Sequence, residues 1–500
     1  MKIFKISFFL LYLPLAVFSQ TGTAASNAFY VSTSGNDSNQ GNLDSPWASF
    51  SKAVSEVAPG DTVYVRAGTY HERLVISTSG TAGNPIVFSA YPDEEVIIDG
   101  RDLSYPNEWC GAIHIDNEHD ITVEGFTVRD SPVMAIFAND SQNIIISNNN
   151  TVNSGNSGIM AWGDSGLTIL GNDIDQACNS NKKPQECISV SHSNDFIITG
   201  NTVHDGYMEG IDVKDGAYTG LVFGNTVYNM IRLGIYIDAW AAHTYSIVVS
   251  GNTVYDCLEG IRVNSENGGL TEDIKVRSNL VYNNTECGIW VNAGGIKAAN
   301  HPVNNILIEG NFCRNNGEDG IRISVPDNGT TTNITLQNNI ITDSGRAGII
   351  VSDFTDGTAA MSGLTIVNNT LYNNGLKEEW GCGGIFMNAG IATDVLIRNN
   401  IVSKNHLFSI VVTTDAAAGE VTVDYNLIDG FKDFNEEITG DHYIKGSPLF
   451  IEAEADNFQI GAGSPVIDAG SAIKAPLLDF SGVQRPQGNG IDVGSFEFSD

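Results

Sequence analysis

The chain has 500 residues, of which 42% are hydrophobic and 17% charged, with 53 glycines against 14 prolines. This length allows up to about three or four domains, or one long repeat architecture. The 59 acidic and 25 basic residues give a formal net charge of −34, which argues against nucleic acid and membranes as main partners because phosphate binding needs a basic surface.

Residues 1–25 have the layout of a secretory signal peptide. Lys2 and Lys5 precede an apolar stretch from Ile6 to Phe18, and small residues follow at positions 24–26. A charged start, a short apolar run and small residues near the cleavage point are typical of such a segment. We therefore expect a secreted mature chain, periplasmic or extracellular, which is a soluble monomer.

Residues 27–110 predict an N-terminal cap with the first strands. The apolar residues Ala53, Val54 and Val57 have the spacing of a short amphipathic helix. The alternating segment from Thr62 to Val65 has the spacing of a strand. A cap is expected because the terminal coil of a repeat protein would otherwise expose apolar edges.

Residues 111–430 repeat one unit, in which a strand leads into a Gly-Asn-Thr-Val-like segment, a turn and a Gly-Ile-x-Val segment. Periods of 20 to 50 residues are typical of solenoids, and the alternating apolar residues are typical of strands. The sequence predicts an all-β fold, a right-handed parallel β-helix (solenoid) of about eleven or twelve coils. One asparagine marks each coil, at Asn150, Asn172, Asn201, Asn225, Asn252, Asn279, Asn311, Asn339, Asn369 and Asn400.

Residues 431–500 lose this repeat and carry Pro448, Pro465 and Pro476. We expect a C-terminal extended segment packed on the helix. The seven cysteines are an odd number, so at least one thiol is free. Cys178 and Cys187 flank a polar insertion, and two interpretations are open for them: a disulfide that closes the loop, or buried small apolar side chains.

Two terminal segments resemble those of secreted, pectate-lyase-like β-helix proteins. At the N-terminus these are the runs from Tyr30 to Asp37 and from Gly60 to Tyr70, and at the C-terminus the run from Asp479 to Pro486 with the run from Asp492 to Glu497. The resemblance covers nearly the whole mature chain and implies action on polysaccharides. It is more specific for the fold than for the reaction, because one fold hosts many activities.

The outward-facing residues of the Gly-Ile-x-Val strands predict two columns along the helix, because alternate residues of a strand face opposite sides. The first column is His114, Phe137, Met160, Ser189, Asp212, Tyr236, Arg262, Trp290 and Arg322. The second is Asp116, Asn139, Trp162, Ser191, Lys214, Asp238, Asn264, Asn292 and Ser324. We expect Trp240, Asn264, Trp290 and Arg322 to bind substrate.

Four carboxylates, Glu186, Glu209, Asp212 and Asp215, are expected to converge over two adjacent coils. Like charges at close range raise each other's pKa or attract a cation. Hard oxygen ligands without His or Cys favour Ca²⁺. The predicted metal site is therefore a calcium site, and a polysaccharide or oligosaccharide is the predicted partner.

The first functional hypothesis is a lyase that cleaves a uronic-acid-containing polysaccharide by Ca²⁺-assisted β-elimination. The segment Glu209-Gly210-Ile211-Asp212, with Glu186 one coil earlier, resembles family 9 pectate lyases, in which acids on two coils hold Ca²⁺ and a lysine on the next coil is the base. This chain has Tyr236 where that lysine belongs. Arg262, Lys214 or Tyr236 would have to act as the base.

The second hypothesis is a glycoside hydrolase that uses two carboxylates on adjacent coils, Asp212 and Asp238. It needs no metal and accepts a neutral glycan. The third is a non-catalytic glycan-binding protein. A plain ladder of salt bridges around Lys214, with no chemical role, is the structural alternative to all three. The predicted catalytic set is thus Asp212, Lys214, Tyr236, Asp238 and Arg262.

Overall fold

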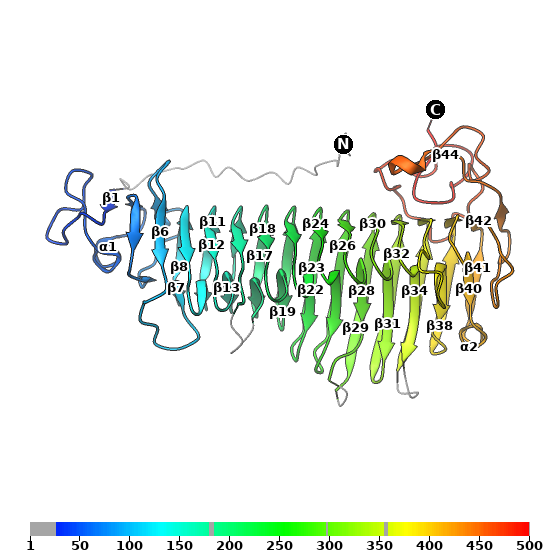
Figure 1. Ribbon diagram of the computed structural model, residues 1–500, viewed down its shortest axis with the longest axis horizontal. Helices are drawn as coiled ribbons and strands as arrows, with labels where there is room; N and C mark the ends of the chain where they lie inside the picture. The colour runs from blue at the N-terminus through cyan, green and yellow to red at the C-terminus, as the bar shows by residue number, and fades with distance from the viewer. Residues whose placement is uncertain (1–26, 180–184, 297–298, 355–358, 500) are drawn as a thin grey trace.

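The computed structural model describes residues 27–179, 185–296, 299–354 and 359–499 (Figure 1). The predicted signal peptide lies outside the described residues. No helix in the described part of the chain has the length and apolar character needed to cross a membrane.

Three long parallel sheets run side by side along one axis, and each turn of the chain gives one strand to each sheet (Figure 1). The first sheet contains β1 (Ala28–Val31), β2 (Thr62–Val65), β5 (Ile86–Ala90), β8 (His119–Glu124), β11 (Gln142–Ser147), β14 (Thr168–Leu170), β17 (Asn194–Thr199), β20 (Tyr218–Phe223), β23 (Thr244–Ser250), β26 (Thr271–Arg277), β29 (His301–Glu309), β32 (Gly329–Gln337), β35 (Ala360–Val367), β38 (Ala392–Arg398) and β41 (Val421–Asp424).

The second sheet contains β4 (Leu74–Ile76), β7 (Gly111–Asp116), β10 (Met134–Asn139), β13 (Ile159–Trp162), β16 (Ile188–Ser191), β19 (Ile211–Lys214), β22 (Leu233–Ala239), β25 (Glu259–Ser265), β28 (Ile289–Asn292), β31 (Ile321–Pro326), β34 (Ala347–Phe354), β37 (Gly383–Asn388) and β40 (Ile410–Val412).

The third sheet contains β3 (Gly68–Tyr70), β6 (Val96–Asp99), β9 (Phe126–Arg129), β12 (Asn150–Val152), β15 (Asp173–Asp175), β18 (Thr202–His204), β21 (Thr226–Tyr228), β24 (Thr253–Tyr255), β27 (Leu280–Tyr282), β30 (Phe312–Arg314), β33 (Ile340–Thr342), β36 (Thr370–Tyr372), β39 (Ile401–Ser403), β42 (Leu427–Asp429) and β43 (Ile444–Lys445).

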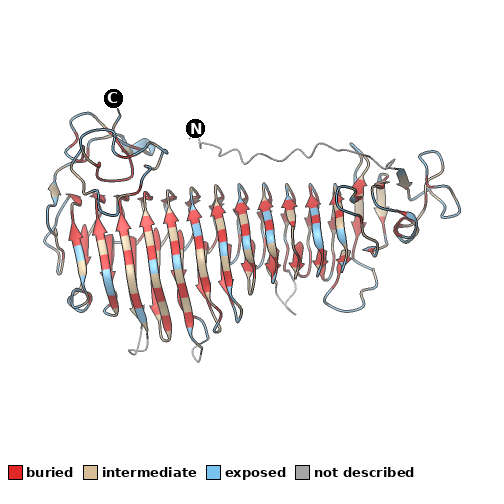
Figure 2. Cartoon of the chain, turned by 180° about the vertical axis from the view of Figure 1, so that it is seen from behind, coloured by how far each residue is buried: buried red, intermediate tan, exposed pale blue. Residues whose placement is uncertain are grey.

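The predicted parallel β-helix is confirmed, with about thirteen turns where eleven or twelve were predicted, since the second sheet has 13 strands. The prediction missed the earliest turns, because residues 62–99 form strands β2 to β6 without the asparagine signal on which the count depended. Inside the turns the apolar residues of each strand are stacked, as Ile235 and Ile237 are on β22, both fully buried. Figure 2 shows buried positions alternating with partly exposed ones along many strands.

A ladder of buried asparagines fixes the turn between the first and third sheets. The backbone N–H of Asn225 donates to Oδ1 of Asn252 at 2.9 Å, and Nδ2 of Asn252 donates to the carbonyl oxygen of Val222 and to Oδ1 of Asn279, both at 3.0 Å. The ladder begins at Asn149. The prediction of Asn150 was wrong by one residue, because Asn150 is the first residue of β12.

The two ends are covered differently. The helix α1 (Phe50–Glu56) is capped by Ser49, whose side chain accepts from the backbone N–H of Lys52, and it buries Phe50, Ala53 and Val54. At the other end lie α2 (Thr414–Ala417), the 3₁₀ helix η1 (Ala453–Ala455) and the antiparallel pair β44 (Phe450–Glu452) and β45 (Asn457–Ile460). This C-terminal part folds back onto the solenoid (Figure 1), where Ser495 Oγ donates to the carbonyl oxygen of Asn339 at 3.0 Å.

All seven cysteines are buried and free in the structure, including Cys178 and Cys187. Cys178 and Cys187 are therefore buried thiols in the structure and do not form the disulfide that was the other interpretation. Burial raises the pKa of the Cys178 thiol well above its usual range, and Cys187 adds to the shift. A thiol that stays protonated behaves as a small apolar side chain.

Candidate active site

The outer face of the second sheet carries the two predicted columns in the predicted register. Ser189, Asp212 and Tyr236 are Cα partners on neighbouring strands, and Arg262, Trp290 and Arg322 continue the same column. In the second column, Ser191, Lys214, Asp238, Asn264, Asn292 and Ser324 are partners in the same way. Neighbouring strands of a sheet lie about 4.8 Å apart, so successive column residues are in contact range.

Lys214 lies among Glu186, Glu209, Asp212 and Asp238, and these five residues are called the acidic cluster below. The Nζ atom of Lys214 lies 2.5 Å from Oε2 of Glu186 and 3.3 Å from Oδ2 of Asp212. Ser189 Oγ donates to the same Glu186 oxygen at 2.8 Å. Burial lowers the pKa of Lys214, but Asp212 and Glu186 together outweigh that and raise it above its ordinary value. The side chain is therefore a fixed ammonium ion at neutral pH.

Asp212 and Asp238 are two almost fully buried carboxyl groups on adjacent strands, with exposed fractions of 2% and 4%. In each, the Oδ1 atom is buried with no hydrogen-bond partner among the described residues. Burial raises the pKa of both groups well above the usual range. Lys214 lowers both pKa values, whereas nearby acids, Glu186 among them, raise both further. Buried carboxyl oxygens without partners are costly, so the pair calls for a functional explanation.

Tyr236, in the first column, is joined to the second column by hydrogen bonds. Its hydroxyl donates to Glu266 and accepts from Nδ2 of Asn264, the latter at 2.8 Å. Asn264 Oδ1 accepts in turn from Asn292 Nδ2 at 2.9 Å. Burial raises the pKa of the Tyr236 hydroxyl well above its usual range, and Asp238 and Glu266 raise it further. Tyr236 is therefore a neutral phenol that donates a hydrogen bond but is a weak base.

Trp290 lies between two guanidinium groups. The Cζ atom of Arg262 is 4.2 Å from the ring centroid of Trp290, and that of Arg322, on the strand beyond, is 4.6 Å from it. The indole Nε1 donates to Ser324 Oγ at 2.7 Å. Cation–π contacts on both sides leave this ring no free face for a sugar. Trp240, in the turn after β22, keeps 42% of its surface exposed.

Three arginines near Lys214 and Trp290 are paired with acids. Arg262 lies 3.3 Å from Glu259, and Arg322 lies 2.6 Å from Asp319. Arg232 lies 2.8 Å from Glu209. The sequence patterns missed Arg232 because it precedes β22 and lies outside the repeated Gly-Ile-x-Val segment.

The four acids predicted to hold calcium are all engaged with other groups. Glu186 and Asp212 contact Lys214, and Glu209 contacts Arg232. Asp215 Oδ1 accepts from the backbone N–H groups of Ala241 and Ala242, at 2.9 and 2.7 Å. Calcium needs six to eight oxygens at about 2.3–2.6 Å, and the acids in this arrangement do not fit that requirement. Calcium binding stays a prediction.

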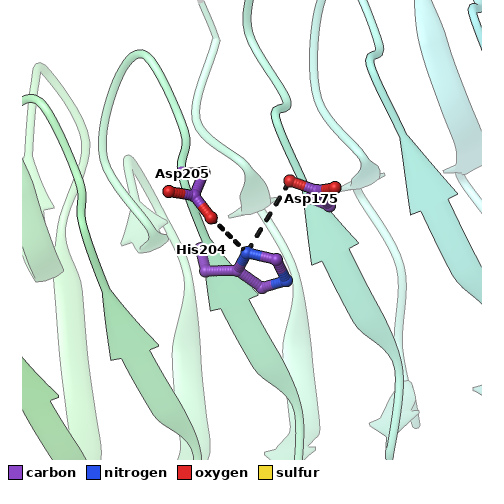
Figure 3. Close-up of side chains that lie close together, drawn as sticks. All are labelled: Asp175, His204 and Asp205. Carbon is purple, nitrogen blue, oxygen red and sulfur yellow. Dashed lines mark hydrogen bonds and ion pairs between the residues drawn. The ribbon is translucent and has the colours of Figure 1, made fainter.

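One group of potential metal ligands lies on the third sheet instead. Within the described ranges, Asp175, His204 and Asp205 are the one such group whose ligand atoms all lie within 4.8 Å of one another (Figure 3). His204 Nδ1 lies 2.6 Å from Asp205 and 3.6 Å from Asp175, and Nε2 lies 3.0 Å from Asp173. Burial lowers the pKa of His204, but these three acids outweigh it and raise the pKa. The contacts are those of a proton-bearing imidazole.

A pocket of about 600 Å³ lies at the N-terminal end of the second sheet. It is lined by residues of both columns, among them His114, Asp116 and Trp162, and by Arg73 and Trp109. The predicted columns include the first three. Arg73 and Trp109 were missed, because they precede β4 and β7 and lie outside the repeat.

Comparisons with known proteins agree with the fold. Residues 29–182 match the family model described as Pel9A-like, right handed beta helix region, and residues 178–305 and 292–448 match the one described as right handed beta helix region. The uncharacterized protein YwoF of Bacillus subtilis (strain 168) is 29% identical over 337 residues, which is 58% of this chain and 69% of YwoF.

Pectate lyase PEL9 of Emericella nidulans is 32% identical over 152 residues, which is 28% of this chain and 37% of that enzyme. Among solved structures, pectate lyase Pel9A superposes with a TM-score of 0.36 and 16% identity, over 96% of this chain and 98% of that one.

Proposed function

Because the chain belongs to the right-handed β-helix family and is a pectate-lyase-like β-helix protein, we propose that it is a carbohydrate-active enzyme that cleaves a uronic-acid-containing polysaccharide. The substrate lies along the two columns of the second sheet. These columns follow the long axis, so a polymer on them meets a new pair of side chains about every 4.8 Å. The predicted signal peptide supports an exported enzyme acting on an extracellular glycan.

The pair of buried carboxyl groups is the observation that carries the proposal. Asp238 has no ion pair among the described residues and a strongly raised pKa, so it keeps its proton and serves as the general acid at the glycosidic oxygen. Asp212 lies 3.3 Å from the Lys214 ammonium, which favours its ionised form. It serves as the base that activates water, or as the nucleophile. Glycoside hydrolysis uses a pair of carboxyl groups with separated pKa values. Burial raises the pKa of both groups here, and the contact that only Asp212 makes with the Lys214 ammonium is the difference between them on which this assignment rests.

β-Elimination with calcium is the second candidate, and the match of residues 29–182 to the Pel9A-like model favours it. The pKa shifts of the candidate bases argue against elimination. Lys214 and Tyr236 both have raised pKa values, so neither releases a proton readily to become the base at neutral pH. Arg262 is paired with Glu259, and a guanidinium is a poor base because it holds its proton tightly.

To test this, the purified protein is incubated with a panel of uronic-acid polysaccharides, with Ca²⁺ or with chelator. If the protein is a hydrolase, new reducing ends form without the ultraviolet absorbance of an unsaturated product. Their formation should be insensitive to chelator and should be lost in Asp238→Asn and Asp212→Asn. The exposed Asp394 provides the matched control, Asp394→Asn. An absorbance rise that chelator abolishes would establish elimination instead. Binding without either product would leave a non-catalytic glycan-binding protein.

A further inference from the structure

The pocket at the N-terminal end lies on the same sheet face as the acidic cluster. In the second column, Trp162 of the pocket is the Cα partner of Ser191, and Ser191 is the partner of Lys214. The pocket wall and the cluster are therefore two strand spacings apart, roughly 10 Å. The volume of about 600 Å³ is in the range of about 300–1,000 Å³ that small-molecule sites occupy.

One wall of the pocket is the loop between β6 and β7, which extends away from the strands in Figure 1. Trp109 of this loop packs edge-to-face on Trp162, with ring centroids 5.7 Å apart. Trp109 keeps 43% of its surface exposed although it is anchored in this contact. An exposed indole at the rim of a pocket is a surface on which the apolar face of a sugar ring can stack.

The floor of the pocket supplies both hydrogen-bond donors and hydrogen-bond acceptors. Asp116 accepts from Nδ2 of Asn139 at 2.7 Å, and the buried Nδ1 of His114 has no hydrogen-bond partner among the described residues. Burial, with Arg73 nearby, lowers the pKa of His114, so its imidazole is neutral and can donate or accept. These groups match the alternating donors and acceptors of sugar hydroxyls.

Arg73 supplies a cation that no carboxylate of the described chain neutralises. Its Nε donates to the carbonyl oxygen of Gly111 at 2.9 Å, and its Cζ lies 5.2 Å from the ring centroid of Tyr105. In contrast, Lys214 and the three arginines near Lys214 and Trp290 are paired with carboxylates. An unpaired guanidinium in a pocket of a chain with net charge −34 favours an anionic ligand group.

We infer that this pocket binds the terminal, carboxylate-bearing sugar of the polysaccharide, so that cleavage proceeds from a chain end. The inference rests on the proposed function, because the acidic cluster on the same face is where the bond is broken. Trp109 stacks on the sugar ring and Arg73 pairs with its carboxylate. Two strand spacings of about 4.8 Å separate the pocket wall from Lys214, so the released product is a short oligosaccharide of about two or three sugars with a narrow length distribution.

The first test measures binding apart from cleavage. The full chain carrying Asp212→Asn is titrated with galacturonic acid, glucuronic acid and their neutral parent sugars while tryptophan fluorescence is recorded. We expect saturable binding of an acidic sugar, a preference over its neutral parent, and at least a tenfold loss of affinity in Trp109→Ala and in Arg73→Gln. The exposed residues Trp380 and Arg277 provide the matched controls Trp380→Ala and Arg277→Gln, which should bind normally.

The second test follows product lengths through the reaction. The wild type should release one short product from the start, whereas Trp109→Ala, whose exposed side chain can be removed without unfolding, should release mixed lengths. No saturable binding of either acid, or the same affinity in the Arg73 and Trp109 variants as in their controls, would overturn the inference. Mixed product lengths from the wild type would overturn it as well. Acid-sugar binding that needs Arg73, in a chain that cleaves nothing, would refute the proposed function and leave the pocket assignment standing.

Discussion

The Nζ atom of Lys214 lies 2.5 Å from Oε2 of Glu186, on the preceding turn of the solenoid. Lys214 is thus the group that allows several acids to share one small region of the sheet. Removing one partner of a buried ion pair leaves the other charge uncompensated.

Lys214→Met should therefore destabilise the protein, by about 3 kcal/mol, since Glu186 and Asp212 lose their counter-ion. Urea denaturation at neutral pH measures the change. Because Glu186→Gln removes the acid as well, the double variant should lose less than the sum of the two single variants. Additive losses would show that the ion pair contributes nothing.

Asp238→Asn should lower the turnover rate without lowering the free energy of unfolding. If Asp238 is the general acid, turnover should fall about 10²- to 10⁴-fold. In wild type, the folded state keeps a proton on Asp238 that the unfolded state releases, so the free energy of unfolding falls as pH rises from the ordinary carboxyl pKa through the raised one.

The amide introduced by Asp238→Asn has no proton to lose, so this variant should lack that fall and be at least as stable as wild type at neutral pH. Urea denaturation at several pH values measures the free energy of unfolding of both proteins. A variant that is less stable at every pH and retains turnover would assign Asp238 a structural role.

His204 should titrate above the ordinary histidine pKa, because Asp205, Asp173 and Asp175 favour its protonated form by more than burial disfavours it. The raised pKa stabilises the fold below the unfolded value, and this contribution is lost as pH rises through the folded value. NMR titration of the imidazole measures the pKa. His204→Gln should lose up to about 1 kcal/mol at low pH and little at high pH. A pKa below the ordinary value would contradict the contacts in Figure 3.

The strands of the repeated part of the chain could be predicted because every turn has the same register as its neighbours. The strand that presents Asp212 also presents Lys214 two residues later, and the pairing with Tyr236 and Asp238 follows from aligning the glycines. The packing of Arg262 and Arg322 on Trp290 could not be predicted, because it depends on side-chain conformation and not on register. The pocket was missed for another reason: Trp109 lies in a loop that occurs once, so no neighbouring turn indicates its position.

Asn252→Ala should be among the most destabilising single substitutions in the solenoid. The side chain accepts from the backbone N–H of Asn225 and donates to the carbonyl oxygen of Val222 and to Asn279, and all of these groups are buried. Alanine would leave them without partners, at about 1–3 kcal/mol for each buried group. Thermal or urea unfolding measures the loss.

Asn435→Ala is the matched control, since Asn435 is exposed and lies outside the ladder. Its change in stability should stay within about 0.5 kcal/mol. Because the ladder links every turn from Asn149 to Asn426, the loss in Asn252→Ala should also appear as faster amide exchange at Asn225, one turn away. A loss no larger than that of the control would mean that water replaces the side chain and that strand packing alone holds the turns in register.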